Sequence, residues 1–147
     1  MISTAEKFKP AQLLLVEDSA GDVRLTREAF HDANSAVELH VAADGAEAIA
    51  FLRNEGPHAA APRPDLILLD LNLPKLDGRE VLALIKEDAN LNSIPTVVLT
   101  TSAAAADIAQ SYKLHANSYF IKPVEFLEFQ GVVKCINEFW LEKAKLP

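Results

Sequence analysis

Short apolar runs alternate along this chain with longer segments in which apolar and polar residues recur at helical spacing. The apolar runs are bounded by turn formers and are about four residues long, which is typical of strands buried on both faces. The clearest run is Leu66-Ile67-Leu68-Leu69, and it ends at an acid, Asp70. The pattern predicts strands at residues 13–16, 39–41, 66–69, 96–99 and 119–121. It predicts helices at residues 20–33, 46–54, 78–87, 103–114 and 125–143.

The strict alternation of strands and helices predicts a parallel sheet, because a crossover helix is what returns the chain to the same edge. Right-handed crossovers place helices on both faces of such a sheet. The predicted fold class is therefore α/β: a doubly wound five-stranded parallel sheet in three layers. We expect one domain over residues 12–147, which ends in an extended helix, and a tail at residues 1–11 before it.

Charge and composition restrict the partners. The net charge of −7 disfavours broad contact with nucleic acid or an anionic membrane, since both need a basic face. The single cysteine, Cys135, excludes an internal disulfide and a cysteine-cluster metal site. Residues 1–10 contain no apolar core of a signal peptide, and the apolar runs are too short to span a bilayer. We expect a cytoplasmic protein that binds neither nucleic acid nor membrane.

Polar side chains stand where the predicted strands end, which is where ligands bind in doubly wound sheets. Glu17 and Asp18 follow the first strand and Asp70 the third, while Thr100 ends the fourth and Lys122 follows the fifth. Each residue also has a plainer explanation as a helix cap, a turn residue or a solvated charge, but their coincidence at one sheet edge favours a site. Carboxylates hold Mg²⁺, a lysine and a hydroxyl neutralise phosphoryl oxygens, and a carboxylate can form an aspartyl-phosphate. Crowding of the acids also predicts a raised pKa for at least one of them.

Four sequence motifs in this order and spacing resemble the receiver domain of bacterial two-component response regulators, over residues 12 to about 143. They are "LLLVEDS" at 13–19, "DLILLDLNLP" at 65–74, "TVVLTTS" at 96–102 and "YFIKP" at 119–123. The resemblance implies a flavodoxin-like (βα)5 fold. It also implies that a partner histidine kinase donates a phosphoryl group to Asp70, with no other enzymatic activity of the chain's own.

The resemblance assigns the metal ligands. Asp18 matches a direct ligand of Mg²⁺ or Mn²⁺, and Glu17 a ligand that acts mostly through water. Asn72, two residues after Asp70, matches the position whose backbone carbonyl binds the metal. Glu17 stands where Asp is more frequent in the family, which changes the outer shell of the metal. No organic cofactor is implied.

The resemblance also assigns a switch. Thr100 matches the hydroxyl that senses the phosphoryl group, Lys122 the lysine that binds it, and Tyr119 the aromatic residue that turns inward on activation. Pro123 matches a proline that the family often holds in a cis peptide bond. Thr101 departs from the small residues common after the switch hydroxyl, and its branched side chain should narrow access to the acyl-phosphate.

The C-terminal part of the sequence indicates how the protein passes its signal to a target. No second module follows the last predicted helix, so we expect output through a protein contact with a downstream target. That helix carries more apolar residues than one core-facing stripe holds, and Phe139 and Trp140 are the candidates for an interface. Together with "VEDSAGDVRLTREAF" and "LTTS", the ending "NEFWLEKAKLP" resembles the regulators paired with phytochromes. These relatives imply a phytochrome as kinase and a homodimer formed through the last strand and helix.

Three other functions share features with this sequence. A haloacid-dehalogenase-like phosphatase also uses an aspartate after a parallel strand, but its proton donor would fall on Asn72, whose amide cannot supply one. A flavodoxin-like electron carrier needs a phosphate loop after the first strand, where "EDSAGD" offers acids instead. An adaptor that works without phosphorylation stays open, because sequence indicates competence and not use.

Overall fold

The computed structural model describes residues 9–147, and within them the chain forms one five-stranded parallel sheet. The strands lie in the order β2-β1-β3-β4-β5, so the chain runs outward in one direction from β1 and in the other from β3. The predicted sheet is confirmed. Of the predicted tail, residues 1–8 lie outside the described residues, and β1 starts before the predicted domain boundary. The bounds are Ala11–Val16 (β1), Val37–Ala42 (β2), Leu66–Leu69 (β3), Thr96–Thr100 (β4) and Ser118–Ile121 (β5).

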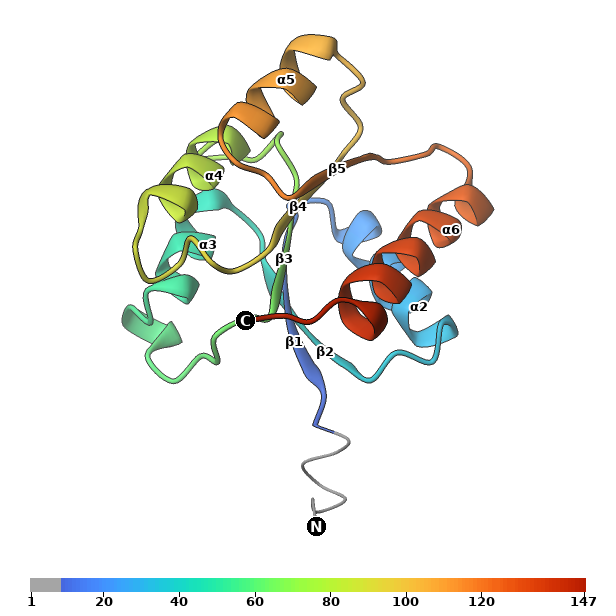
Figure 1. Ribbon diagram of the computed structural model, residues 1–147, viewed down its shortest axis with the longest axis horizontal. Helices are drawn as coiled ribbons and strands as arrows, with labels where there is room; N and C mark the ends of the chain where they lie inside the picture. The colour runs from blue at the N-terminus through green and yellow to red at the C-terminus, as the bar shows by residue number, and fades with distance from the viewer. Residues whose placement is uncertain (1–8) are drawn as a thin grey trace.

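Helices follow each strand, as Figure 1 shows. A short 3-10 turn, Gly56–His58, lies in the proline-containing loop between α3 and β3. The predicted C-terminal helix is a composite, because it is α-helical only to Ile136 and continues as a π-helix over Asn137–Lys143. Hydrophobic periodicity does not distinguish these two hydrogen-bonding patterns over so few residues. The helix bounds are Ala20–Asp32 (α2), Gly45–Leu52 (α3), Gly78–Glu87 (α4), Ala105–Lys113 (α5) and Phe126–Ile136 (α6).

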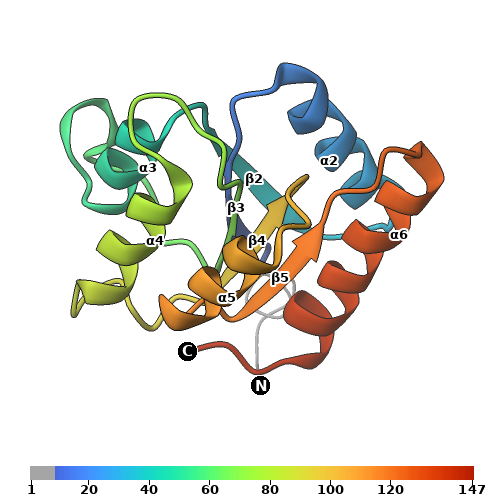
Figure 2. The ribbon, with the colours of Figure 1, turned by 90° about the horizontal axis from the view of Figure 1, so that it is seen from above.

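The helices form the two outer layers, which are seen from above in Figure 2. Helices α2 and α6 pack together on one face of the sheet, and α3, α4 and α5 cover the other. Alternate residues of a strand point to opposite faces, so Leu13 and Leu15 join the core under α2 and α6. Leu14 and Val16 join the core under α3 and α4. All four residues of β3 are fully buried in this way, which explains its unbroken apolar sequence.

The sheet order creates a crevice outside the carboxyl ends of β1 and β3. These strands are neighbours, yet their following helices, α2 and α4, lie on opposite faces of the sheet. Doubly wound folds bind ligands where the connections diverge in this manner. No helix in residues 9–147 is both long enough and apolar enough to cross a membrane.

Candidate functional site

Three predicted acids meet at this crevice. Glu17 and Asp18 follow β1 and Asp70 follows β3, and one carboxylate oxygen of each lies within 4.8 Å of the others. The strand register explains the meeting, because Val16 pairs with Leu69 and the Asp70 N–H donates to the carbonyl oxygen of Val16 at 3.1 Å. Glu17 and Asp70, the residues that follow this pair, therefore lie side by side at the carboxyl edge of the sheet.

The three carboxylates differ in their surroundings. Glu17 and Asp70 are buried, while Asp18 is exposed to solvent. The Asn72 N–H donates to Asp70 Oδ1 at 3.1 Å, which orients the Asp70 carboxylate and places Asn72 beside it. Oxygen donors of this kind fit Mg²⁺ or Mn²⁺, which prefer carboxylates and carbonyls together with water.

Lys122 reaches the cluster from the loop after β5. Its backbone N–H donates to the Thr100 carbonyl oxygen at 2.7 Å, which holds the loop against β4. Its buried ammonium group donates to Glu17 Oε1, to Asp22 Oδ2 at 2.9 Å and to Asp70 Oδ2 at 3.1 Å. The predicted proximity of Lys122 to Asp70 is therefore present.

Asp22 is a member of the site that the sequence reading missed. It lies in the first turn of α2, which is capped by Ser19, and an acid there is ordinarily explained by the helix dipole. No local pattern distinguishes it from such an acid, because Asp18 lies before the helix and the spacing of Asp18 and Asp22 is therefore not a helical one. Only the fold reveals that the Asp22 carboxylate meets Lys122.

The electrostatics of the cluster are set mainly by burial. Burial raises the pKa of Glu17 to about 7; the charge of Asp70 adds to the rise, and Lys122 opposes it. The predicted raised pKa is present, but repulsion among acids is not its main cause. For Lys122, burial lowers the pKa, yet the hydrogen bonds to Glu17 and Asp22 and the charge of Asp70 raise it overall. The ammonium group therefore stays charged.

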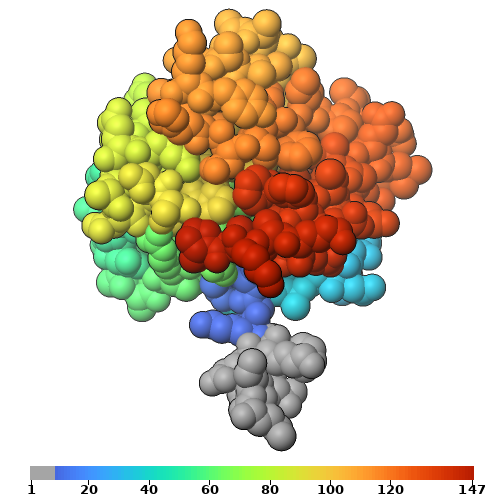
Figure 3. All heavy atoms as spheres, in the orientation of Figure 1, coloured from blue at the N-terminus to red at the C-terminus, as the bar shows by residue number. Residues whose placement is uncertain are grey.

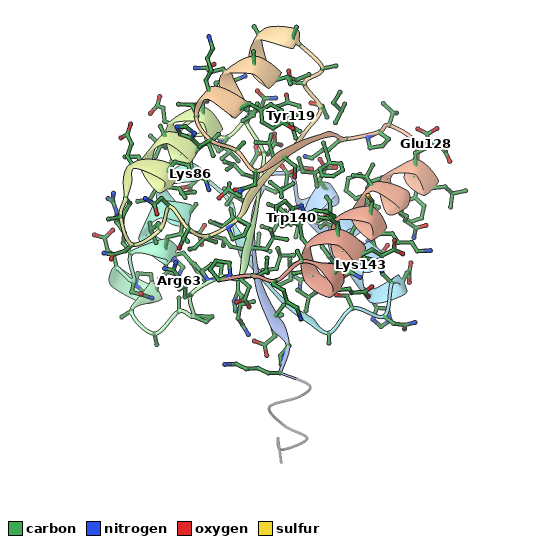
Figure 4. All side chains as sticks on the ribbon, viewed as in Figure 1. Arg63, Lys86, Tyr119, Glu128, Trp140 and Lys143 are labelled. Carbon is green, nitrogen blue, oxygen red and sulfur yellow. The ribbon has the colours of Figure 1, made fainter. Side chains whose placement is uncertain are left out.

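The predicted switch residues lie beside this cluster. The Thr100 hydroxyl is fully buried and has no hydrogen-bond partner among residues 9–147, and an unpaired buried hydroxyl costs about 1–3 kcal/mol. Tyr119 lies between the sheet and α5 (Figure 4) and donates to the Ser102 carbonyl oxygen at 2.9 Å. Thr101 is exposed and lines, with Asp22 and Lys122, a cavity of about 320 Å³ next to the site.

A half-buried polar network connects the loops after β3 and β4. The Ser102 hydroxyl donates to Asp107 Oδ2 at 2.6 Å. The other oxygen of Asp107 accepts two hydrogen bonds from the Arg79 guanidinium, at 2.7 and 3.2 Å. Arg79 also bonds Asp77, the residue that caps α4. The network ties the start of α4, close to Asp70, to the loop that follows Thr100.

The expectation of a cis peptide bond before Pro123 is wrong. Every peptide bond of residues 9–147 is trans, including the one between Lys122 and Pro123. The preference for trans before proline is only about 0.5–1 kcal/mol. A lysine–proline sequence therefore does not determine the isomer, and the surrounding loop decides it.

The two interface candidates face different ways. Phe139 is 55% exposed. Trp140 is partly buried and packs against the core between α2, α6 and the sheet, and Figure 4 shows it on the sheet side of α6. The two rings meet edge to face, with their centroids 5.0 Å apart. Phe139 is therefore the residue available to a partner, and Trp140 belongs to the core.

Comparison with known proteins gives consistent matches. Residues 13–134 match the family described as "Response regulator receiver domain". The chain is 48% identical to response regulator Rcp1 of Synechocystis sp. PCC 6803, over 97% of each chain. It superposes on the crystal structure of the phosphorylated cyanobacterial phytochrome response regulator RcpA with a TM-score of 0.91 and 51% identity, over 94% of this chain and 99% of that one. The Mn²⁺-bound form of Rcp1 matches with a TM-score of 0.90 and 48% identity, over 94% and 99%.

Proposed function

The chain belongs to the response regulator receiver domain family, and on that premise we propose that Asp70 accepts a phosphoryl group from a histidine kinase in the presence of Mg²⁺. The observation that carries the proposal is the cluster of Glu17, Asp18 and Asp70 with the Lys122 ammonium group beside it. The buried, unpaired hydroxyl of Thr100 supports it further, because a phosphoryl oxygen on Asp70 would supply the missing partner.

In the transfer, an Asp70 carboxylate oxygen attacks phosphorus, the phosphorus–nitrogen bond of phosphohistidine breaks, and its electron pair returns to the imidazole. Glu17, Asp18 and Asp70 would hold the divalent ion together with the Asn72 carbonyl oxygen. When bound, the ion neutralises charge on the phosphoryl oxygens. Lys122 donates to one phosphoryl oxygen, and the Thr100 hydroxyl donates to another. The Mn²⁺-bound form of a similar protein, response regulator Rcp1, supports the binding of a divalent ion.

The kinase partner that we propose is a phytochrome. One similar structure is described as a cyanobacterial phytochrome response regulator, and its match extends over nearly all of the described fold. The kinase supplies the phosphoryl group ultimately from ATP, which places the exchange in the cytoplasm. We treat residues 12–147 as one receiver unit whose output is a protein contact.

A homodimer through the last strand and helix is part of the proposal. β5 is an edge strand, and an edge offers unpaired backbone groups to a second chain. Figure 3 shows α5, β5 and α6 forming one continuous side of the molecule, in orange to red. Each of these elements, or the segment directly after it, carries an exposed apolar side chain: Tyr112, Ile121 and Phe139. Exposed apolar side chains of this kind are typical of an isologous interface.

The alternatives are weaker. The family match does not favour a haloacid-dehalogenase-like phosphatase, and Asn72 cannot act as its proton donor. The crevice holds acids where a flavodoxin would need a phosphate loop. An adaptor that functions without phosphorylation would not explain why a buried lysine, Lys122, lies beside the Asp70 carboxylate.

Incubation with acetyl phosphate and Mg²⁺, followed by intact mass measurement, tests the proposal. The wild type should gain one phosphoryl group that hydroxylamine removes, and the gain should vanish with EDTA. Asp70→Asn and Asp18→Ala should gain none. If Asp70→Asn gained phosphate under the same conditions, the acceptor would be misassigned.

A further inference from the structure

The Lys122 ammonium group is saturated in the unphosphorylated protein. An ammonium group has three N–H donors, and here they are directed at carboxylates of Glu17, Asp22 and Asp70. No donor is left for a phosphoryl oxygen. If Lys122 binds the phosphoryl group, one of these three acceptors has to release it.

The three acceptors are not equally free to leave. Glu17 is buried and its carboxylate also accepts from the Ser19 N–H at 3.2 Å. Asp70 is the residue that carries the phosphoryl group, and its second oxygen is held by Asn72. The Asp22 side chain is 34% exposed, and within residues 9–147 its carboxylate has no hydrogen-bond donor other than Lys122. Asp22 is therefore the acceptor that can turn toward solvent at least cost.

We propose that Asp22 is a positioning residue that occupies Lys122 while Asp70 is unphosphorylated and opposes the phosphorylated state by competing for the same ammonium group. The inference rests on the proposed function. Two physical effects act in the same direction. Asp22 takes a charge-assisted hydrogen bond that the phosphoryl oxygen needs, and its negative charge repels the negatively charged phosphoryl group. Asp22 thus limits how strongly the site holds a phosphoryl group.

An isosteric substitution separates this role from a structural one. Asp22 belongs to the first turn of α2 through its backbone: its N–H donates to Ser19 Oγ, and its carbonyl oxygen accepts from Thr26 Oγ1. Asp22→Asn leaves both backbone bonds and removes only the charge and one strong acceptor. A merely structural Asp22 would make this variant bind a phosphoryl analogue more weakly, whereas competition for Lys122 makes it bind more tightly.

The probe is beryllofluoride, which binds an aspartate carboxylate as an analogue of the phosphoryl group, titrated by calorimetry at saturating Mg²⁺. Asp22→Asn should bind it about threefold to tenfold more tightly than the wild type. It should also keep acetyl-phosphate-derived phosphate longer after the donor is removed. Asp22→Glu, which restores the charge, should return the affinity toward the wild-type value. Asp32→Asn is the matched control, because it makes the same change at the exposed far end of α2 and should leave the affinity unchanged.

The outcomes distinguish the two proposals. If the wild type binds beryllofluoride and Asp22→Asn binds it equally or more weakly, the role of Asp22 is wrong and the proposed function stands. If the wild type does not bind it, or Asp70→Asn binds it equally well, the proposed function fails and the role of Asp22 fails with it. Should Asp22→Asn not fold, Asp22→Ser supplies the same test.

Discussion

The phenol of Tyr119, on the edge strand β5, donates a hydrogen bond to the backbone carbonyl oxygen of Ser102 at 2.9 Å. Ser102 lies two residues after Thr100, and its side chain continues the connection to Asp107 and Arg79. One hydrogen bond therefore ties the side of the molecule proposed as the dimer contact to the loop that carries the buried switch hydroxyl. A movement of that loop on phosphorylation would therefore be transmitted to β5.

Removing this bond should weaken the unphosphorylated fold. Tyr119→Phe loses one partly buried hydrogen bond and should lower the free energy of unfolding by about 1 kcal/mol, measured by urea unfolding at neutral pH. Tyr112→Phe, at an exposed position on α5, is the control and should change it little. Equal effects of the two substitutions would contradict a role for the Ser102 contact.

Ionisation of the Tyr119 phenol should also lower the stability of the fold at alkaline pH. Burial is the main cause that raises its pKa above the ordinary 10. A raised pKa in the folded state means that the neutral form is favoured there, so this stabilisation is present below pH 10 and is lost as the pH rises above it. Unfolding midpoints followed from about pH 9 to about pH 11 should fall more steeply for the wild type than for Tyr119→Phe. Parallel curves would contradict the prediction.

Truncation of Phe139 and truncation of Trp140 should affect different properties, namely dimer affinity and the stability of the fold. Phe139→Ala should weaken the dimer by about 2 kcal/mol, roughly thirtyfold in the dissociation constant, with little loss of monomer stability. Trp140→Ala should instead lower the free energy of unfolding by about 2 kcal/mol, because it leaves a gap in a half-buried core contact. Sedimentation velocity and thermal unfolding of both variants separate the cases. A wild type that stays monomeric at high micromolar concentration, with and without acetyl phosphate, would remove the dimer proposal.

Gly78 should be required at the start of α4. A Cβ at this position would collide with the backbone carbonyl oxygen of Asp70 and with the backbone of Leu71, so α4 can approach the site only without a side chain there. Gly78→Ala should cost about 1–3 kcal/mol of stability and slow phosphorylation by acetyl phosphate, since it displaces Asp70. Gly131→Ala is the control, because a Cβ there meets no atom within 4 Å. Unchanged phosphorylation in Gly78→Ala would contradict the close packing.

Substitution of Asp18 should weaken Mg²⁺ binding without weakening the fold. Asp18 is exposed, and its carboxylate makes no hydrogen bond within residues 9–147, so Asp18→Ala should change the free energy of unfolding without metal by no more than about 0.5 kcal/mol. Its affinity for Mg²⁺ should nevertheless fall at least about tenfold, measured by calorimetric titration. A variant that kept wild-type Mg²⁺ affinity would place the metal elsewhere.

The sequence by itself determined the strands, their parallel arrangement and most of the site. The four apolar residues Leu66–Leu69 between turn formers indicated a strand buried on both faces, and alternation with helices indicated a parallel sheet. Because strand ends in such a sheet meet at one edge, the residues that follow β1, β3 and β5 had to converge, and Glu17, Asp18, Asp70 and Lys122 did so. These features follow from local periodicity and chain connectivity.

Only the tertiary structure decided which side chains touch. The partner of Asp22 lies 100 residues away, and the register of α2 against the loop after β5 brings the two together. The packing of the last helix likewise decided that Trp140 turns inward and Phe139 outward, since adjacent residues of a helix point in different directions and both positions are aromatic. The trans bond before Pro123 and the π-helical end of the chain belong to the same group. In each case the competing local conformations differ by little free energy, so long-range packing makes the choice.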